Sequence, residues 1–137
     1  QKVASGKEEG VRLVVKALIS SGVAMSIAGT SRPASGGEHK FSHWLESNYD
    51  NPALHGEQCG LGSIATMYLH GGDWKRIRNT LRAVNAPINS RELGIDDGII
   101  LEALIKSKEI RPQRITILDK STQKQIEEAA LATGIIG

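Results

Sequence analysis

The stretch HGEQCGLGSIATMYL, residues 55–69, predicts a helix that is bounded on both sides. Asn51-Pro52 breaks the chain before it, because the residue that precedes a proline is pushed out of helical geometry. Gly71-Gly72 follows it, and glycine is common just past the end of a helix. The segments on either side of this helix show the same alternation of helical pattern and break.

Five more helices are predicted outward from this one. In the first, residues 7–28, the apolar residues Val11, Val14, Val15 and Leu18 recur in steps of three and four, which is the period of an amphipathic helix. The five predicted helices cover residues 7–28, about 35–46, 74–84 and 96–106, and the last one starts at Ser121 or Thr122 and ends before Gly134. We therefore expect an all-α, bundle-like domain of about six helices over residues 1–137.

Particular residues support the helix boundaries. Ser35 and Glu38 have the spacing of a capping box, and Asp73 is a suitable cap for the helix that follows it. Residues 111–118 are the exception, because their β-branched side chains favour an extended segment. We expect Trp44 and Trp74 to anchor the core.

Composition excludes several classes of protein. The 137 residues are 39% hydrophobic and carry a net charge of +2, which fits one domain without a general basic face for nucleic acid. A single cysteine rules out an internal disulfide. The most apolar stretch, residues 11–28, contains Arg12 and Lys16, so no membrane span is expected. We expect a cytoplasmic protein.

Three of the four histidines crowd together in the sequence. His39 and His43 are four residues apart, which places them on one face of a helix, and His55 begins the next predicted helix. Two antiparallel helices would bring all three together, and imidazole is a common ligand for zinc, copper, iron and nickel. Addition of Cys59 would make a closed structural zinc site instead, and ordinary surface or core histidines remain a third interpretation.

Other residues near the histidines allow both a functional and a structural reading. Gly56, Gly60 and Gly62 indicate close approach by a ligand or by another helix. Glu57 is a candidate to orient a metal ligand, or it is simply a favourable acidic residue in a first helical turn. Arg32 is a candidate to hold a phosphate, or it forms a surface ion pair.

Two long segments resemble a known family. SRPASGGEHKFSHWLE, residues 31–46, and LHGEQCGLGSIATMYLHGGDW, residues 54–74, are similar to the archaeal sn-glycerol-1-phosphate dehydrogenases. These enzymes belong to the superfamily of iron/zinc polyol dehydrogenases and dehydroquinate synthases. The segment ELGIDDGIILEALIKSKEIRPQRITILDK, residues 92–120, resembles the C-terminal part of the same family.

The resemblance implies a division of labour. Family members have an N-terminal domain that binds the nicotinamide cofactor and a C-terminal helical domain that completes the metal site, and this chain resembles the second alone. His39 and His55 would bind the metal, expected to be Zn²⁺, and His43 would face the substrate as the catalytic and substrate-binding residue. The third metal ligand and the cofactor-binding residues would lie outside this chain.

The implied reaction is the reduction of dihydroxyacetone phosphate by NADH or NADPH to sn-glycerol 1-phosphate, for archaeal ether lipids. The expected partners are this substrate, the enzyme's own N-terminal nucleotide-binding domain and further copies of the chain in a homo-oligomer. The chain alone would be inactive. Alternatives are a glycerol dehydrogenase, a dehydroquinate synthase-like lyase, and a stand-alone helical module with a structural zinc or no metal.

Overall fold

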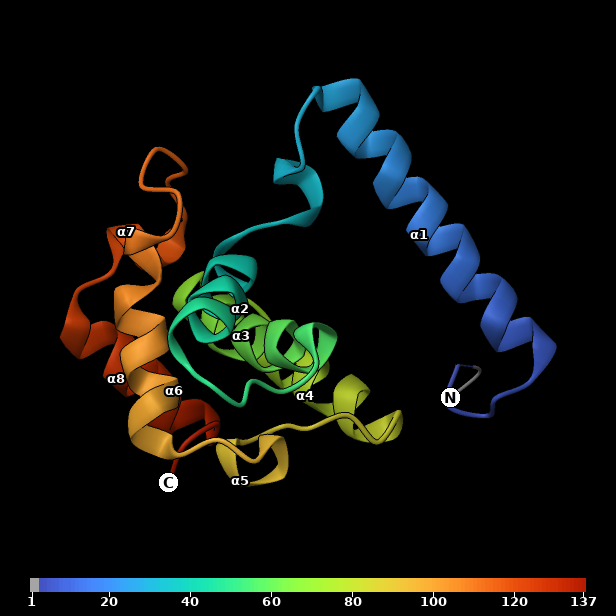
Figure 1. The fold of residues 1–137 in the computed structure, drawn as a ribbon. Helices are drawn as coiled ribbons and strands as arrows, with labels where there is room; N and C mark the ends of the chain where they lie inside the picture. Colours follow the sequence, from blue (N-terminus) through green and yellow to red (C-terminus); the bar gives the residue numbers. More distant parts are fainter. Residues whose placement is uncertain (1–2) are drawn as a thin grey trace. The chain divides into compact units, whose positions relative to one another are not determined.

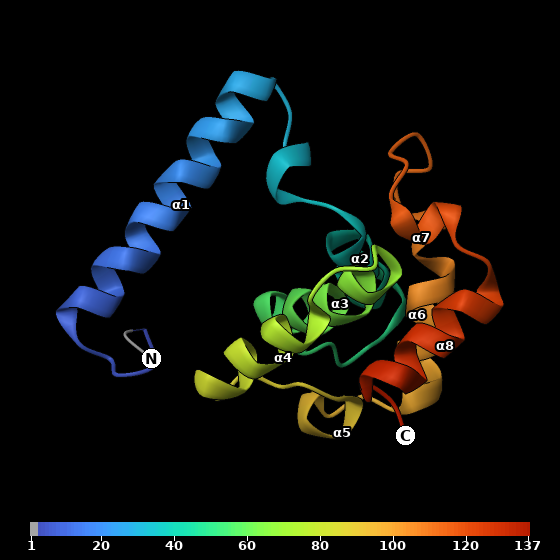
Figure 2. The same cartoon turned by 180° about the vertical axis from the view of Figure 1, so that it is seen from behind.

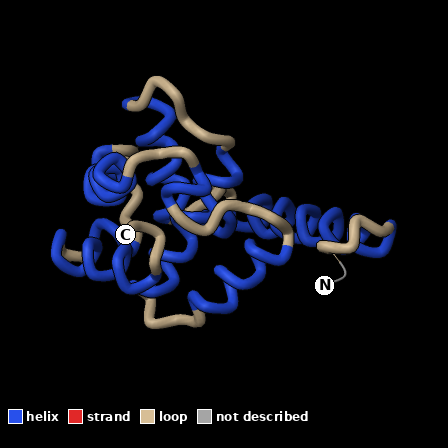
Figure 3. Tube along the Cα trace, turned by 90° about the horizontal axis from the view of Figure 1, so that it is seen from below, coloured by secondary structure: helices blue, strands red, loops and turns tan. Residues whose placement is uncertain are grey.

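The computed structural model describes residues 3–137, and Figure 3 shows helices joined by loops, with no strand among them. In chain order the elements are α1 (Glu8–Ala28), the 3-10 helix η1 (Arg32–Ala34), α2 (Gly37–Asn48), α3 (His55–Leu69), α4 (Trp74–Ala83), α5 (Ser90–Leu93), α6 (Asp97–Lys106), η2 (Ser107–Glu109), α7 (Ile117–Lys120) and α8 (Gln123–Thr133). Both α5 and α7 are single turns of four residues, so six longer α-helices remain in the described chain. The prediction of an all-α fold with about six helices is confirmed.

Side-chain caps explain where several helices begin. Asp73 accepts the backbone N–H of Arg76 at the start of α4, as predicted, and Thr122 forms a capping box with Gln125 at the start of α8. Helix α3 has the predicted bounds, whereas α2 begins at Gly37 instead of Ser35.

The expectation of an extended segment over residues 111–118 is wrong at both ends. The backbone N–H of Arg114 donates to the carbonyl oxygen of Arg111 at 2.8 Å, which closes a turn at the start of the segment. Ile117 and Leu118 belong to α7. The cause is local: the Asp119 carboxylate accepts the backbone N–H and the hydroxyl of Thr116, each at 2.7 Å, and this cap starts a helical turn.

The chain divides into two compact units, Gln1–Gly36 and Gly37–Gly137. In the second unit, α3 packs against α2, α4, α7 and α8, as the two opposite views in Figures 1 and 2 show. The core of this unit is contributed by almost every helix in it, and its fully buried large side chains include Phe41, Leu45, Leu61, Ile64, Ile88, Ile100, Leu104, Leu118 and Ile135. Trp44 is buried and Trp74 packs against the core, as predicted.

A buried ion pair joins α2 to α7. Lys40 is only 2% exposed, and its Nζ lies 2.7 Å from Asp119 Oδ1 and 3.1 Å from the carbonyl oxygen of Arg114. Burial disfavours the Asp119 carboxylate, but hydrogen bonds from Lys40 and Thr116 outweigh it and lower the pKa of Asp119. Asp119 therefore both caps α7 and fixes it to the helix that carries His39 and His43.

Helix α1 forms most of the first unit. It has 21 residues, and an 18-residue window within it has a mean hydropathy of 1.6, so by length and composition alone it is apolar enough to cross a membrane despite Arg12 and Lys16. Helices in the core of soluble proteins can have the same length and apolar composition. The charges of Arg12 and Lys16 therefore do not exclude a membrane span by composition. That α1 does not span a membrane stays a prediction.

Candidate metal and substrate site

The three histidines meet where α2 faces the start of α3. Their ring centroids lie 5.2 Å apart for His39 and His55, 5.3 Å for His43 and His55, and 6.4 Å for His39 and His43. His39 and His43 are one turn apart on α2, and His55 is the first residue of α3. The predicted convergence of these side chains is confirmed, while their individual roles stay predictions.

A carboxylate holds Nδ1 of every one of these rings. His39 Nδ1 lies 2.9 Å from Glu38 Oε1, and His43 Nδ1 lies 3.0 Å from Glu46 Oε2. His55 Nδ1 lies 2.7 Å from Glu46 Oε1. A neutral imidazole that donates Nδ1–H to a carboxylate has its lone pair on Nε2. Partners of this kind fix the orientation of metal-binding histidines in proteins.

Glu46 is a candidate orienting residue that the sequence analysis missed. Burial works against its ionisation, but hydrogen bonds from His55 and then His43 outweigh that effect and lower the pKa of Glu46. Each carboxylate oxygen serves one ring, so Glu46 links the ring predicted to bind metal to the ring predicted to face the substrate. Its spacing of three residues from His43 was the available signal. The side chain of the predicted orienting residue, Glu57, forms no hydrogen bond or ion pair with a described residue.

Buried polar side chains form a chain of hydrogen bonds that begins at His55. The Ser42 hydroxyl lies 2.9 Å from His55 Nδ1 and donates to Gln58 Oε1 at 2.8 Å. The Gln58 amide in turn donates to the carbonyl oxygen of Ala53 at 2.6 Å. Ser42 and Gln58 are both fully buried, so this chain of hydrogen bonds fixes the loop before α3 against α2.

Cys59 lies one turn after His55, and its Sγ is 3.5 Å from His55 Nε2. Burial, together with the nearby Glu38 and Glu46 carboxylates, raises the pKa of Cys59 to about 11. The metal-free thiol is therefore protonated at neutral pH, whereas a metal ligand has to be a thiolate.

Two sets of possible metal donors come close together in the described chain. The donor atoms of His39, His55 and Cys59 lie within 4.8 Å of one another, and so do those of His43, Glu46 and His55. His55 belongs to both sets, whereas His39 belongs only to the first and His43 only to the second. The four side chains of the closed-site alternative thus do not form one compact donor set in this arrangement.

The glycines at the start of α3 serve helix packing. A Cβ on Gly62 would lie 2.9 Å from the Phe41 ring and 3.1 Å from the Glu38 backbone, so α2 and α3 can approach closely only with glycine there. A Cβ on Gly60 would lie 3.1 Å from Leu81 of α4, while Gly56 faces open space. The structural interpretation accounts for Gly60 and Gly62.

For Arg32, whose side chain is exposed, the phosphate-binding role stays a prediction.

The fold and the site define an all-α domain with an oriented cluster of three histidines suited to a divalent metal. No family model matches the chain. It is 61% identical over 133 residues to a Pyrococcus horikoshii protein, 59% over 123 residues to one from Methanospirillum hungatei, and 66% over 111 residues to one from Methanococcoides burtonii.

All three relatives are named glycerol-1-phosphate dehydrogenase, with NAD(P)+ as part of the name. The matches cover 96%, 90% and 81% of this chain, but only 38%, 34% and 31% of the relatives. The chain therefore spans about a third of the length of the relatives it matches. The resemblance to the glycerol-1-phosphate dehydrogenases is confirmed over this part of their length.

Proposed function

We propose that the chain is the C-terminal helical part of an NAD(P)-dependent sn-glycerol-1-phosphate dehydrogenase, which reduces dihydroxyacetone phosphate to sn-glycerol 1-phosphate. The observation that carries this proposal is the 61% identity over 133 residues to a protein of that name. The names of the relatives favour this substrate over those of a glycerol dehydrogenase or a dehydroquinate synthase-like lyase.

The donor set supports a divalent metal, with zinc as the proposed ion. His39 and His55 would hold it through Nε2, because Nδ1 of each ring already faces a carboxylate oxygen. Together they supply two of the three protein ligands that a catalytic zinc commonly has. The third would come from a part of the protein outside this chain. When bound, such a metal supplies Lewis acidity at the substrate's carbonyl oxygen.

His43 is the proposed catalytic and substrate-binding residue. Its Nδ1 is held by Glu46, so Nε2 is the atom available to hydrogen-bond a substrate hydroxyl or to relay a proton. The ionised Glu46 carboxylate would stabilise the imidazolium that forms when His43 takes up a proton. Because the same carboxylate also holds His55, it would keep the substrate contact and the metal ligand in fixed relation.

The nicotinamide cofactor would be bound mainly by the N-terminal nucleotide-binding domain of the longer protein. In this proposal residues 1–137 are the metal- and substrate-binding domain, and hydride transfer requires the other domain to position the cofactor. The cytoplasmic location and a homo-oligomeric state are proposed with it.

The test compares this chain with a longer protein that contains it. Both are assayed for oxidation of NADH and NADPH with dihydroxyacetone phosphate, and the product is resolved by stereochemistry. The longer protein should form sn-glycerol 1-phosphate, and the 137-residue chain should show no turnover. A longer protein that is inactive with dihydroxyacetone phosphate but active with glycerol would contradict the proposal.

A further inference from the structure

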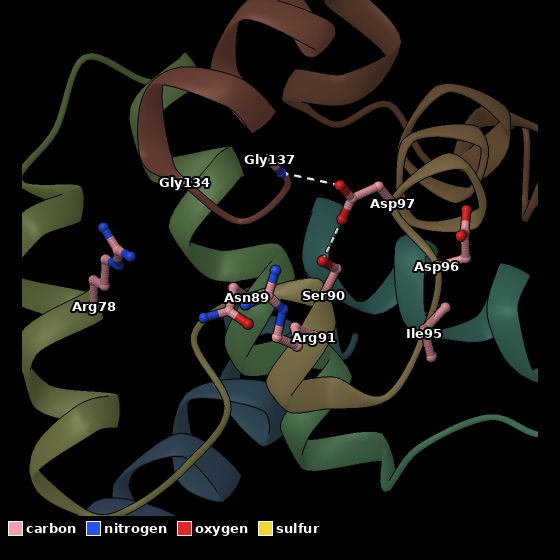
Figure 4. A pocket seen from close by; sticks show the side chains of 9 residues that line it. All are labelled: Arg78, Asn89, Ser90, Arg91, Ile95, Asp96, Asp97, Gly134 and Gly137. Atoms are coloured by element: carbon pink, nitrogen blue, oxygen red, sulfur yellow. Dashed lines mark hydrogen bonds between the residues drawn. The ribbon is translucent and has the colours of Figure 1, made fainter.

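A polar cavity lies in the unit Gly37–Gly137 and shares no residue with the histidine cluster. Its volume is about 560 Å³. Figure 4 shows Arg78 of α4 across the cavity from Asn89 and Arg91, with Gly134 and Gly137 of the C-terminal segment along one edge. The remaining lining residues are Ser90, Ile95, Asp96 and Asp97.

The acidic groups of this cavity are already engaged within the protein. Asp97 accepts hydrogen bonds from the Ser90 hydroxyl and from the backbone N–H of Gly137, which lower the pKa of Asp97. Asp96 accepts the backbone N–H of Gly98 at 2.8 Å and caps α6. The carboxylates therefore serve to hold the cavity wall together.

The guanidinium groups are held less firmly, although the charge of Arg91 contributes to the lowered pKa of Asp97. Arg78 Nε is buried and has no hydrogen-bond partner among the described residues, which is unusual for a buried polar atom. Neither Arg78 nor Arg91 forms an ion pair within 4 Å in the described chain. Each group offers several N–H donors in a planar fork whose geometry matches that of an oxyanion.

A neighbouring hollow extends the positive character of this region. Its volume is about 220 Å³, and it is lined by Trp74, Lys75, Arg78, Asn79 and Arg82. Arg78 borders both cavities, and no acidic residue lines the second one. An anion beside Arg78 would thus face Arg91 on one side and Lys75 and Arg82 on the other.

We propose that Arg78 and Arg91 form an anion site that takes a phosphate or diphosphate group, with Lys75 and Arg82 adding attraction from the neighbouring hollow. Arg78 is the central residue, because it borders both cavities and its buried Nε lacks a partner. The site is separate from the proposed metal site and does not depend on the dehydrogenase assignment.

The test is calorimetric titration of the metal-free 137-residue chain with inorganic pyrophosphate at physiological salt, which suppresses weak surface attraction. Arg78→Gln and Arg91→Gln should each weaken binding about tenfold or more, since a hydrogen bond to a charged group is lost. Arg78→Lys, which keeps the charge and loses the fork, should fall between Arg78→Gln and the unmodified chain. Arg76→Gln is the matched control, because Arg76 is on α4 but lines neither cavity, and it should change the affinity by less than about twofold.

Two results would overturn the proposal. One is the absence of measurable pyrophosphate binding to the unmodified chain at millimolar concentration. The other is an equal loss in Arg76→Gln and Arg78→Gln, which would show a general attraction between a basic surface and an anion. Circular dichroism and the melting temperature show whether each variant is folded. If Arg78→Gln does not fold, Arg91→Gln still tests the proposal.

Discussion

Oε1 of Glu46 lies 2.7 Å from Nδ1 of His55 and thereby joins the last turn of α2 to the first residue of α3. The second oxygen of the same carboxylate lies 3.0 Å from Nδ1 of His43. One side chain thus orients a ring proposed to bind metal and a ring proposed to bind substrate.

Glu46→Gln should lower the affinity for zinc about 10- to 100-fold, as is typical when a partner of a metal-binding histidine is lost. The amide would present an oxygen to one ring and an NH₂ group to the other, so both rings could not keep their present tautomer. A zinc titration against a competing chelator measures the change. Glu57→Gln is the matched control and should leave the affinity unchanged; equal losses in the two variants would contradict the assignment.

Gly62→Ala should reduce the free energy of unfolding by about 1–3 kcal/mol, because the added methyl group would press on Phe41 and on the Glu38 backbone. The same substitution at Gly56, which faces open space, should be neutral or stabilise by up to about 1 kcal/mol, since alanine is the better helix former. Urea unfolding of both variants gives the comparison. Equal effects would show that the contact between α2 and α3 is not tight at Gly62.

Asp119→Asn should destabilise the chain by about 3 kcal/mol or more, because it leaves the buried ammonium of Lys40 without its charge partner. Glu102→Gln, which breaks an exposed pair with Lys106, should cost at most about 1 kcal/mol. Thermal unfolding at neutral pH compares the two variants. A small loss for Asp119→Asn would mean that Lys40 finds another partner.

The pH dependence of the Asp119 contribution follows from its lowered pKa. The stabilisation is fully present above the ordinary aspartate pKa and is lost as the pH falls through the lower pKa of the folded state. The difference in stability between the unmodified chain and Asp119→Asn should therefore be constant near neutral pH and shrink below about pH 4. A difference that grew on acidification would have the wrong sign.

Cys59 should be a slow nucleophile in the metal-free chain. With the pKa raised to about 11, the thiolate fraction at pH 8 is far below that of a free cysteine, and greater intrinsic nucleophilicity offsets only part of this. Alkylation by iodoacetamide should be at least about tenfold slower than for the same residue in the unfolded chain. Equal rates in the folded and unfolded chains would show that the thiol is neither buried nor shifted.

Much of the fold could be predicted because its signals are local. The break at Asn51-Pro52 and the glycines after residue 69 define α3, and Asp73 and Thr122 cap the helices that follow them. The prediction for residues 111–118 is wrong because β-branched side chains favour strands in general. The cap between Thr116 and Asp119 and the helical turn that it starts form together, so neither is visible in the residue types alone.

The clustering of the three histidines was predictable, but the side chains that orient their rings were not. The spacing of His39, His43 and His55 indicates a cluster, since two of them share a helix face. The contact between Glu46 and His55 spans nine residues and depends on how α2 and α3 pack, which spacing cannot show. The ion pair between Lys40 and Asp119, 79 residues apart, is a tertiary contact of the same kind.

The most direct test of the central proposal is the metal content of three histidine variants in the longer dehydrogenase that we propose contains this chain. His39→Ala and His55→Ala should lose the metal together with activity. His43→Ala should keep the metal while kcat falls, KM rises, or both, because it loses a substrate contact or a proton relay. Cys59→Ser should also keep the metal. If His43→Ala lost its metal as fully as His39→Ala, or if Cys59→Ser did so, the proposed division between metal ligands and substrate residue would be wrong.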